Sequence, residues 1–167
     1  MSPRNPSRLA VALLMMCLHG PALAQEPARV PDRFARSALR PDRSVEEQMA
    51  RMKQRWPDRF GIALVEAVGE AESLTHGETT YSTQEFRPVG WIFLRWLVSD
   101  PPSPGDRLRV HYWFRAEESA NQPRVDSRRI AFLEPAGTRG ELIAEMLLPA
   151  TDEHLHHVQR AIQDAGF

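Results

Sequence analysis

One strictly alternating segment constrains the fold of this chain more than any other feature. From residue 108 to 114, apolar side chains occupy every second position, at Leu108, Val110, Tyr112 and Phe114. A period of two residues places successive side chains on opposite faces of a β-strand. The segment therefore predicts a strand with one face in a hydrophobic core and one polar face.

Further β-rich runs surround this strand. They cover residues 62–72, 79–98 and 129–133, and turns rich in Pro and Gly at 99–105 and 134–140 separate them. Short connections favour antiparallel neighbours. Residues 141–148 fit either a helix or a strand, because both spacings collect apolar residues on one face, and Pro149 ends the segment in either case.

Two amphipathic helices are expected, one on each side of these strands. Ser44 and Glu47 form a capping box before a helix from Val45 to about Trp56. Thr151 is a good N-cap for a last helix over residues 152–165. The order of elements predicts an α+β fold, mainly β: a small barrel or sandwich flanked by an N-terminal and a C-terminal helix.

Residues 1–24 have the layout of a secretory signal peptide. A basic start with Arg4 and Arg8 precedes an apolar run over 9–18, and small residues at Ala22 and Ala24 form a cleavage site before Gln25. The run is too short to span a bilayer, which takes about 20 residues. We expect a periplasmic or secreted protein with no transmembrane segment after cleavage. A short core helix is the alternative interpretation.

Cleavage changes the cysteine count and the charge. Cys17 is the single cysteine, and Met16 before it is not the small residue that a lipoprotein signal needs. The whole chain has 21 Lys and Arg against 22 Asp and Glu, a net charge of -1, and cleavage removes two Arg and no acid. The mature chain then has no thiol chemistry, and its charge gives no electrostatic case for binding nucleic acid.

The order of strands resembles a known group of domains. The segment Val65 to Ala71 is followed by an aromatic strand that runs into Asp100 to Asp106, then by the strand Leu108 to Phe114 and by Ile130 to Leu133. This order is similar to uncharacterised exported bacterial domains with an oligonucleotide/oligosaccharide-binding (OB) type barrel. It is more remotely similar to netrin-like domains and tissue inhibitors of metalloproteinases. The resemblance covers about residues 60–135 and rests on spacing and β pattern.

The resemblance implies a small OB-like antiparallel barrel but no functional residue. The inhibitors of that superfamily reach the metal of their target with an N-terminal cysteine, and the mature chain contains none. The expected organisation is a signal peptide at 1–24, a flexible basic leader at 25–43, an amphipathic helix at 44–57 and an OB-like barrel domain with the C-terminal helix at 58–167. The basic leader either contacts the rest of the mature chain, which is acidic on balance, or binds a partner, or is solvated.

The polar face of the alternating strand is the first candidate site. It carries Arg107, Arg109, His111, Trp113 and Arg115. Arginines beside an aromatic ring suit an anionic or aromatic ligand on a barrel surface. The alternative is a solvated face on which the Arg stems cover Trp113 and pair with Glu66, Glu70 or Glu85.

The second candidate site is a histidine cluster in the last helix. His154 and His157 are three residues apart and could share one helix face as ligands of Zn or Cu, whereas His156 would point elsewhere. A solvated helix face is the alternative. No other cofactor is expected.

These features favour an exported, non-catalytic binding or interaction module of the bacterial envelope, with a protein or a small anionic ligand as its partner. An envelope metal-binding protein that uses His154 and His157 is the alternative. An enzyme is a third class, but the chain has no Gly-x-Ser-x-Gly motif and no Gly-rich phosphate loop.

Overall fold

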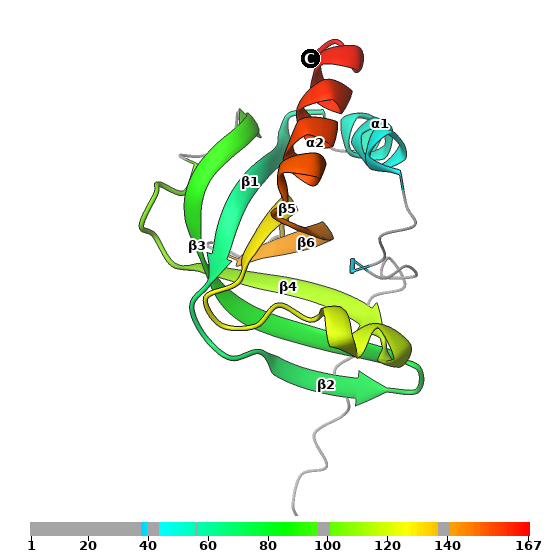
Figure 1. The fold of residues 1–167 in the computed structure, drawn as a ribbon, viewed down its shortest axis with the longest axis vertical. Helices are drawn as coiled ribbons and strands as arrows, with labels where there is room; N and C mark the ends of the chain where they lie inside the picture. The colour runs from blue at the N-terminus through cyan, green and yellow to red at the C-terminus, as the bar shows by residue number, and fades with distance from the viewer. Residues whose placement is uncertain (1–37, 40–43, 56, 97–100, 137–140) are drawn as a thin grey trace, which may run out of the picture. The chain divides into compact units, whose positions relative to one another are not determined.

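The computed structural model describes residues 38–39, 44–55, 57–96, 101–136 and 141–167. All of them lie in the second of the two units into which the chain divides, residues 34–167. In chain order, the elements are α1 (Val45–Arg55), β1 (Arg59–Ala67), β2 (Glu72–His76), β3 (Thr79–Trp96), β4 (Leu108–Arg115), the 3-10 helix η1 (Ala116–Asn121), β5 (Arg128–Pro135), β6 (Glu141–Pro149) and α2 (Asp152–Asp164) (Figure 1). The predicted α+β class, mainly β, is confirmed. Residues 1–24, the predicted signal peptide, lie outside the described part.

The strands form one sheet in the order β1-β5-β6-β4-β3-β2, and β1 also pairs with β3. β3 pairs with three strands because it is long. Residues 79–86 pair with β4, residues 79–83 pair with β2 on the opposite edge, and residues 86–96 pair with β1. The pairings among β1, β5, β6, β4 and β3 therefore form a closed set, because β3 pairs again with β1. Strand β2 extends the sheet beyond β3.

Two features of the sheet correct the sequence prediction. The expected sheet was antiparallel throughout, but β4 and β6 pair in parallel over residues 109–111 and 141–143. They run in the same direction because β5 crosses over to lie between β1 and β6. The strand expected over 62–72 ends at Ala67, and β2 was missed because all five of its side chains are exposed and follow no apolar alternation.

The sheet separates two hydrophobic clusters. The first lies on the side that β4 fills with Leu108, Val110, Tyr112 and Phe114. The second lies between the other side of β1, β5 and β6 and the two helices, and it contains Phe60, Ile62, Phe132 and Met146. Figure 1 shows α1 and α2 next to each other over these strands. The face of β4 that was predicted to be apolar therefore lies in a hydrophobic core.

Residues 141–148, which fitted a helix or a strand, belong to strand β6. Phe132 pairs with Met146 and Leu133 with Ala144, so Glu145 is an extra residue that forms a bulge. The bulge shifts the apolar alternation by one residue, which is why the sequence shows no clean period of two. The Glu145 carboxylate is almost fully buried and lies 3.7 Å from Nη1 of Arg55 in α1.

Both helices begin where the sequence predicts. The amide of Glu47 donates to Oγ of Ser44 at 3.0 Å, and the amide of His154 donates to Oγ1 of Thr151 at 3.2 Å. Each helix buries one face, as expected of an amphipathic helix. In α1, Val45, Met49 and Met52 are buried, and Trp56 lies outside the described part. In α2, Val158 and Ala161 are buried, while Leu155, Ile162 and Ala165 are partly buried.

The structure describes two residues of the predicted leader, Ala38 and Leu39, and both are buried. The amide of Ala38 donates to the carbonyl of Trp113 at 2.8 Å, and its carbonyl accepts from the amide of Leu147 at 2.8 Å. Ala38 thus links β4 to β6 beyond the residues where these strands pair directly. The predicted flexible leader therefore contains two buried residues, one of which is hydrogen-bonded to both strands.

Candidate binding surface

Strand β4 presents the predicted polar face on the side of the sheet opposite its core residues. Arg109, His111 and Arg115 follow one another at alternate positions, and Arg107 precedes the strand. The side chains of Arg107, Arg109 and Arg115 are more than half exposed, and His111 is about one-third exposed. These four side chains are available to a partner.

Trp113 does not belong to the exposed part of this face. Only 3% of the residue is accessible. This burial fits the alternative in which Trp113 is covered, and the indole ring is not open for an aromatic ligand to stack against.

Each of the four exposed or partly exposed basic residues of the predicted face has a carboxylate close to it. Arg107 Nη1 lies 2.8 Å from Glu85 Oε2, and Arg109 Nη2 lies 3.6 Å from Glu72 Oε2. Two further pairs complete the set: His111–Glu141 at 3.5 Å and Arg115–Glu117 at 3.7 Å. An anionic ligand would have to compete with these carboxylates.

The acids proposed from the sequence as partners of this face have different roles. Glu85 does pair with it. Glu66 instead contacts Arg87 and Arg128, whose hydrogen bonds lower the pKa of its carboxyl group. Glu70 makes no hydrogen bond or ion pair with the described part of the chain, which leaves its carboxylate available.

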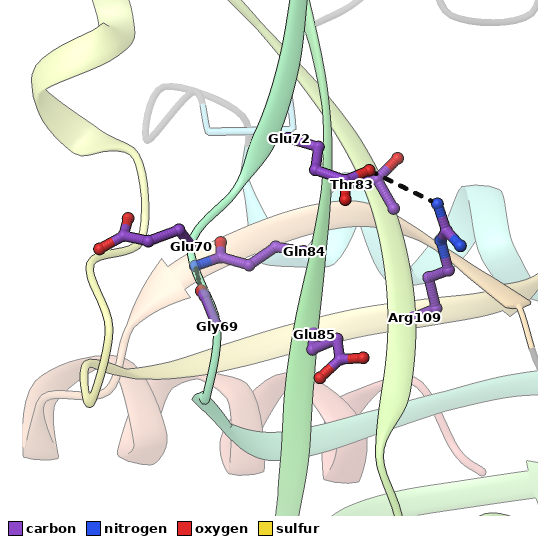
Figure 2. A pocket seen from close by; sticks show the side chains of 7 residues that line it. All are labelled: Gly69, Glu70, Glu72, Thr83, Gln84, Glu85 and Arg109. Carbon is purple, nitrogen blue, oxygen red and sulfur yellow. Dashed lines mark hydrogen bonds and ion pairs between the residues drawn. The ribbon is translucent and has the colours of Figure 1, made fainter.

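A surface pocket of about 180 Å³ lies beside Arg109. One connection and three strands build it: the connection after β1, strand β2, the middle of β3, and β4. The lining residues are Gly69, Glu70, Glu72, Thr83, Gln84, Glu85 and Arg109 (Figure 2). Three carboxylates and one guanidinium line the pocket, so its charge balance is acidic.

Gln84 holds the wall of this pocket in place. Its Nε2 donates to the carbonyl oxygens of Gly69 at 2.7 Å and Pro123 at 3.3 Å. Its Oε1 accepts a 2.8 Å bond from the hydroxyl of Tyr112. The buried amide therefore fixes the connection after β1 against β3, and Figure 2 shows the amide beside Gly69. Sequence reasoning missed Gln84 and Glu72, because a polar residue in a β-rich run gives no sign of the loop that it binds.

No protein-family model matches the chain, and no curated protein does. The relationship to exported OB-type, netrin-like or inhibitor domains therefore stays a prediction. Within the described ranges, no helix is long and apolar enough to cross a membrane.

The histidines of α2 have separate partners. His154 Nδ1 lies 2.9 Å from Oγ1 of Thr151 and 3.0 Å from the carbonyl oxygen of Pro149, at the start of the helix. His157 Nε2 lies 2.7 Å from Oε1 of Glu46 in α1. A backbone hydrogen bond lowers the pKa of the Glu46 carboxyl most, and the bond with His157 adds to this.

His156 Nε2 lies 3.1 Å from Nη2 of Arg160 on its own helix. In the part of the chain that the structure describes, no three His, Cys, Asp or Glu side chains gather as they would around a metal ion. The contacts of His154 and His157 give both rings a structural role, in the helix start and in the link between α1 and α2. The Zn or Cu site stays a prediction that no contact favours.

Proposed function

We propose that this chain is an exported, non-catalytic interaction module of the bacterial envelope that binds a protein at the pocket beside Arg109. The partner inserts one basic side chain between Glu70, Glu72 and Glu85. The observation that carries this proposal is the acidic lining of the pocket, together with the carboxylate of Glu70, which makes no hydrogen bond or ion pair with the described residues.

The charge pattern supports a protein partner over a small anion. Glu85 and Glu72 already balance Arg107 and Arg109, so the arginines do not form an uncompensated basic patch. A surface with both signs of charge fits a partner surface that also carries both signs, and such complementarity steers association and selects the partner.

The size of the pocket supports the same conclusion. Small-molecule sites usually enclose about 300–1,000 Å³. At about 180 Å³, this pocket is smaller than that range and suits the end of one long side chain. A Lys or Arg from the partner brings a positive charge to Glu70, which has no ion pair within the part of the chain that the structure describes.

The fold behind the proposal is an OB-type barrel. The closed set of pairings among β1, β3, β4, β6 and β5 supports it, with β2 as an addition. OB-folds bind ligands on the face of their second and third strands and in the adjoining loops. In this chain β3 and β4 take those places in the ring, and the pocket lies on them. The layout of residues 1–24 supports export.

Site-specific photo-crosslinking in the native host tests the binding site. A photo-reactive amino acid at Thr83 should give a protein adduct that decreases at least several-fold when Glu70→Gln is added. The matched control is Glu153→Gln, an exposed acid on α2, which should leave the adduct unchanged. An adduct at Thr83 that ignores Glu70→Gln, or one that forms equally from the exposed Val89, would refute the site.

Mass spectrometry of the protein recovered from the periplasm tests export. We expect a mature N-terminus at Gln25. An intact chain beginning at Met1, found only in the cytoplasm, would contradict the envelope location.

A further inference from the structure

Strand β2 forms an edge of the sheet. Among the described residues it pairs with β3 alone, and all five of its side chains are exposed. Leu74, at its centre, is 57% accessible, the highest value among the exposed large apolar residues of the described part. Natural edge strands are protected from pairing with another chain by a Pro, a bulge, charged side chains (especially Lys) or a very short length. β2 has no Pro, Lys or bulge, and its protection is limited to its length of five residues and the charge of Glu72.

The hairpin that joins β2 to β3 determines which backbone groups point outward. Its loop is Gly77–Glu78, and Gly77 has a φ of 59°, the conformation that a type II′ turn requires at this position. The residues that flank such a two-residue loop, His76 and Thr79, exchange backbone hydrogen bonds, and this alternates along an antiparallel pair. Ser73 and Thr75 therefore direct their N–H and C=O groups away from β3.

The sequence of β2 is complementary to itself when it is reversed. In an antiparallel pair centred on Leu74, Glu72 of one copy lies opposite His76 of the other, and Ser73 lies opposite Thr75. Leu74 lies opposite Leu74. This places a carboxylate against an imidazole at both ends, two exposed leucines against each other in the middle, and the free backbone groups of Ser73 and Thr75 in hydrogen-bonding positions.

We propose that two copies of this chain associate through their β2 strands, with a twofold axis at Leu74. Pairing continues the sheet of one copy into that of the other and covers both exposed leucines. A twofold contact uses the same patch on both copies, so it closes as a dimer and leaves no β2 edge for further addition. The proposal does not depend on the function of the pocket.

The size of the contact sets its strength. Two five-residue strands bury less than the roughly 1,200–2,000 Å² of a standard stable interface. The dimer is therefore weak and depends on protein concentration, and sedimentation equilibrium over a range of concentrations should show exchange between monomer and dimer.

A proline at position 75 tests the backbone part of the contact. Thr75→Pro removes an outward N–H in both copies while leaving the hydrogen bonds to β3 in place, and we expect the dissociation constant to rise at least tenfold. Thr75→Ala is the matched control. It loses the 3.0 Å contact between the hydroxyls of Thr75 and Thr80 but keeps the N–H, so it should dimerise like the original chain.

A cysteine at position 74 tests the register. Directly opposed residues that do not share hydrogen bonds have Cα atoms about 4.5 Å apart, within the range for a disulfide. In the full chain with Cys17→Ser, Leu74→Cys should cross-link rapidly under mild oxidation. Val89→Cys, at an exposed position on strand β3, should not.

Three results would overturn the proposal. They are a chain that stays monomeric up to millimolar concentration, a dimer that Thr75→Pro leaves intact, and cross-linking through Leu74→Cys that is no faster than through Val89→Cys. Circular dichroism of each variant shows that the hairpin is retained.

Discussion

The hydroxyl of Tyr112 in β4 donates a 2.8 Å hydrogen bond to Oε1 of Gln84 in β3. Both residues are almost fully buried. Because Nε2 of Gln84 also binds the carbonyls of Gly69 and Pro123, one side chain connects the strand that carries the polar face with two loops. The pocket wall depends on this connection.

Replacing Gln84 should destabilise the protein more than replacing its partner. Gln84→Leu removes the donor to the carbonyl oxygens of Gly69 and Pro123 and the acceptor of the 2.8 Å bond from Tyr112, which should cost about 2–4 kcal/mol in the free energy of unfolding. Tyr112→Phe removes one bond and should cost about 1 kcal/mol. Urea denaturation of both variants measures the difference, and equal losses would contradict the role of Gln84 as a connector.

Tyr112 should make stability depend on alkaline pH. Burial raises its pKa from 10.0 to about 12. The folded state therefore holds the phenolic proton more tightly than the unfolded state. The resulting stability is complete below pH 10 and is lost between pH 10 and about 12, by roughly 2–3 kcal/mol. Tyr112→Phe should flatten the decline over that interval in urea titrations; an unchanged slope would show that the phenol does not cause it.

Gly61 should not tolerate a side chain. A Cβ at this position would lie 2.5 Å from Cζ3 of Trp91, whose ring is held by a 2.9 Å bond from Nε1 to the carbonyl of Pro102. Gly61→Ala should cost about 1–3 kcal/mol because the indole must move. Gly90→Ala in β3 is the control, since its Cβ meets no atom within 4 Å. Thermal unfolding compares the two variants, which should differ clearly.

The free energy of unfolding should depend on the ion pair between Arg55 and Glu145, the residue at the bulge in β6. The carboxylate is buried, while the guanidinium is about one-third exposed. Arg55→Met should therefore cost about 1–2 kcal/mol, less than the roughly 3–5 kcal/mol for breaking a fully buried pair. In Glu145→Gln, which has no charge to balance, the same substitution should cost less. A double-mutant cycle measures the coupling, and a value near zero would assign Arg55 a packing role only.

The stability of the protein should depend on Thr151, the N-cap residue of α2. Thr151→Ala removes the acceptor for the His154 amide and should cost about 1 kcal/mol, whereas Thr151→Ser should be nearly neutral. Chemical denaturation checks both. If the serine variant is as unstable as the alanine variant, the hydroxyl is not the stabilising group.

The elements that depend only on local sequence patterns were predicted well. The alternation in β4 and the caps at Ser44 and Thr151 depend on neighbouring residues, so the sequence alone was sufficient. Strand β2 and the bulge at Glu145 depend on partners far along the chain. A fully exposed strand shows no hydrophobic alternation, and a bulge breaks the alternation, so neither could be predicted from local periodicity.

The candidate surface shows the same division. Alternation correctly placed Arg109, His111 and Arg115 on one face of β4. It could not show that Trp113, on the same face, is buried. Alternation indicates on which face of a strand a side chain lies, but it does not indicate what covers that face. The acidic pocket needs Gly69, Gln84 and Arg109 from three separate segments, which only the pairing of β3 with β4 and the Gln84 bonds bring together.

The position of Ala38 also bears on the order of folding. A ribosome makes this residue long before Leu147, yet its backbone bonds to Leu147 and Trp113 can form only when both β4 and β6 are in place. The segment at residues 38–39 must therefore wait for the rest of the domain. The earliest part of the domain to be synthesised is among the last to dock, and a chain stalled before β6 would leave that docking position incomplete.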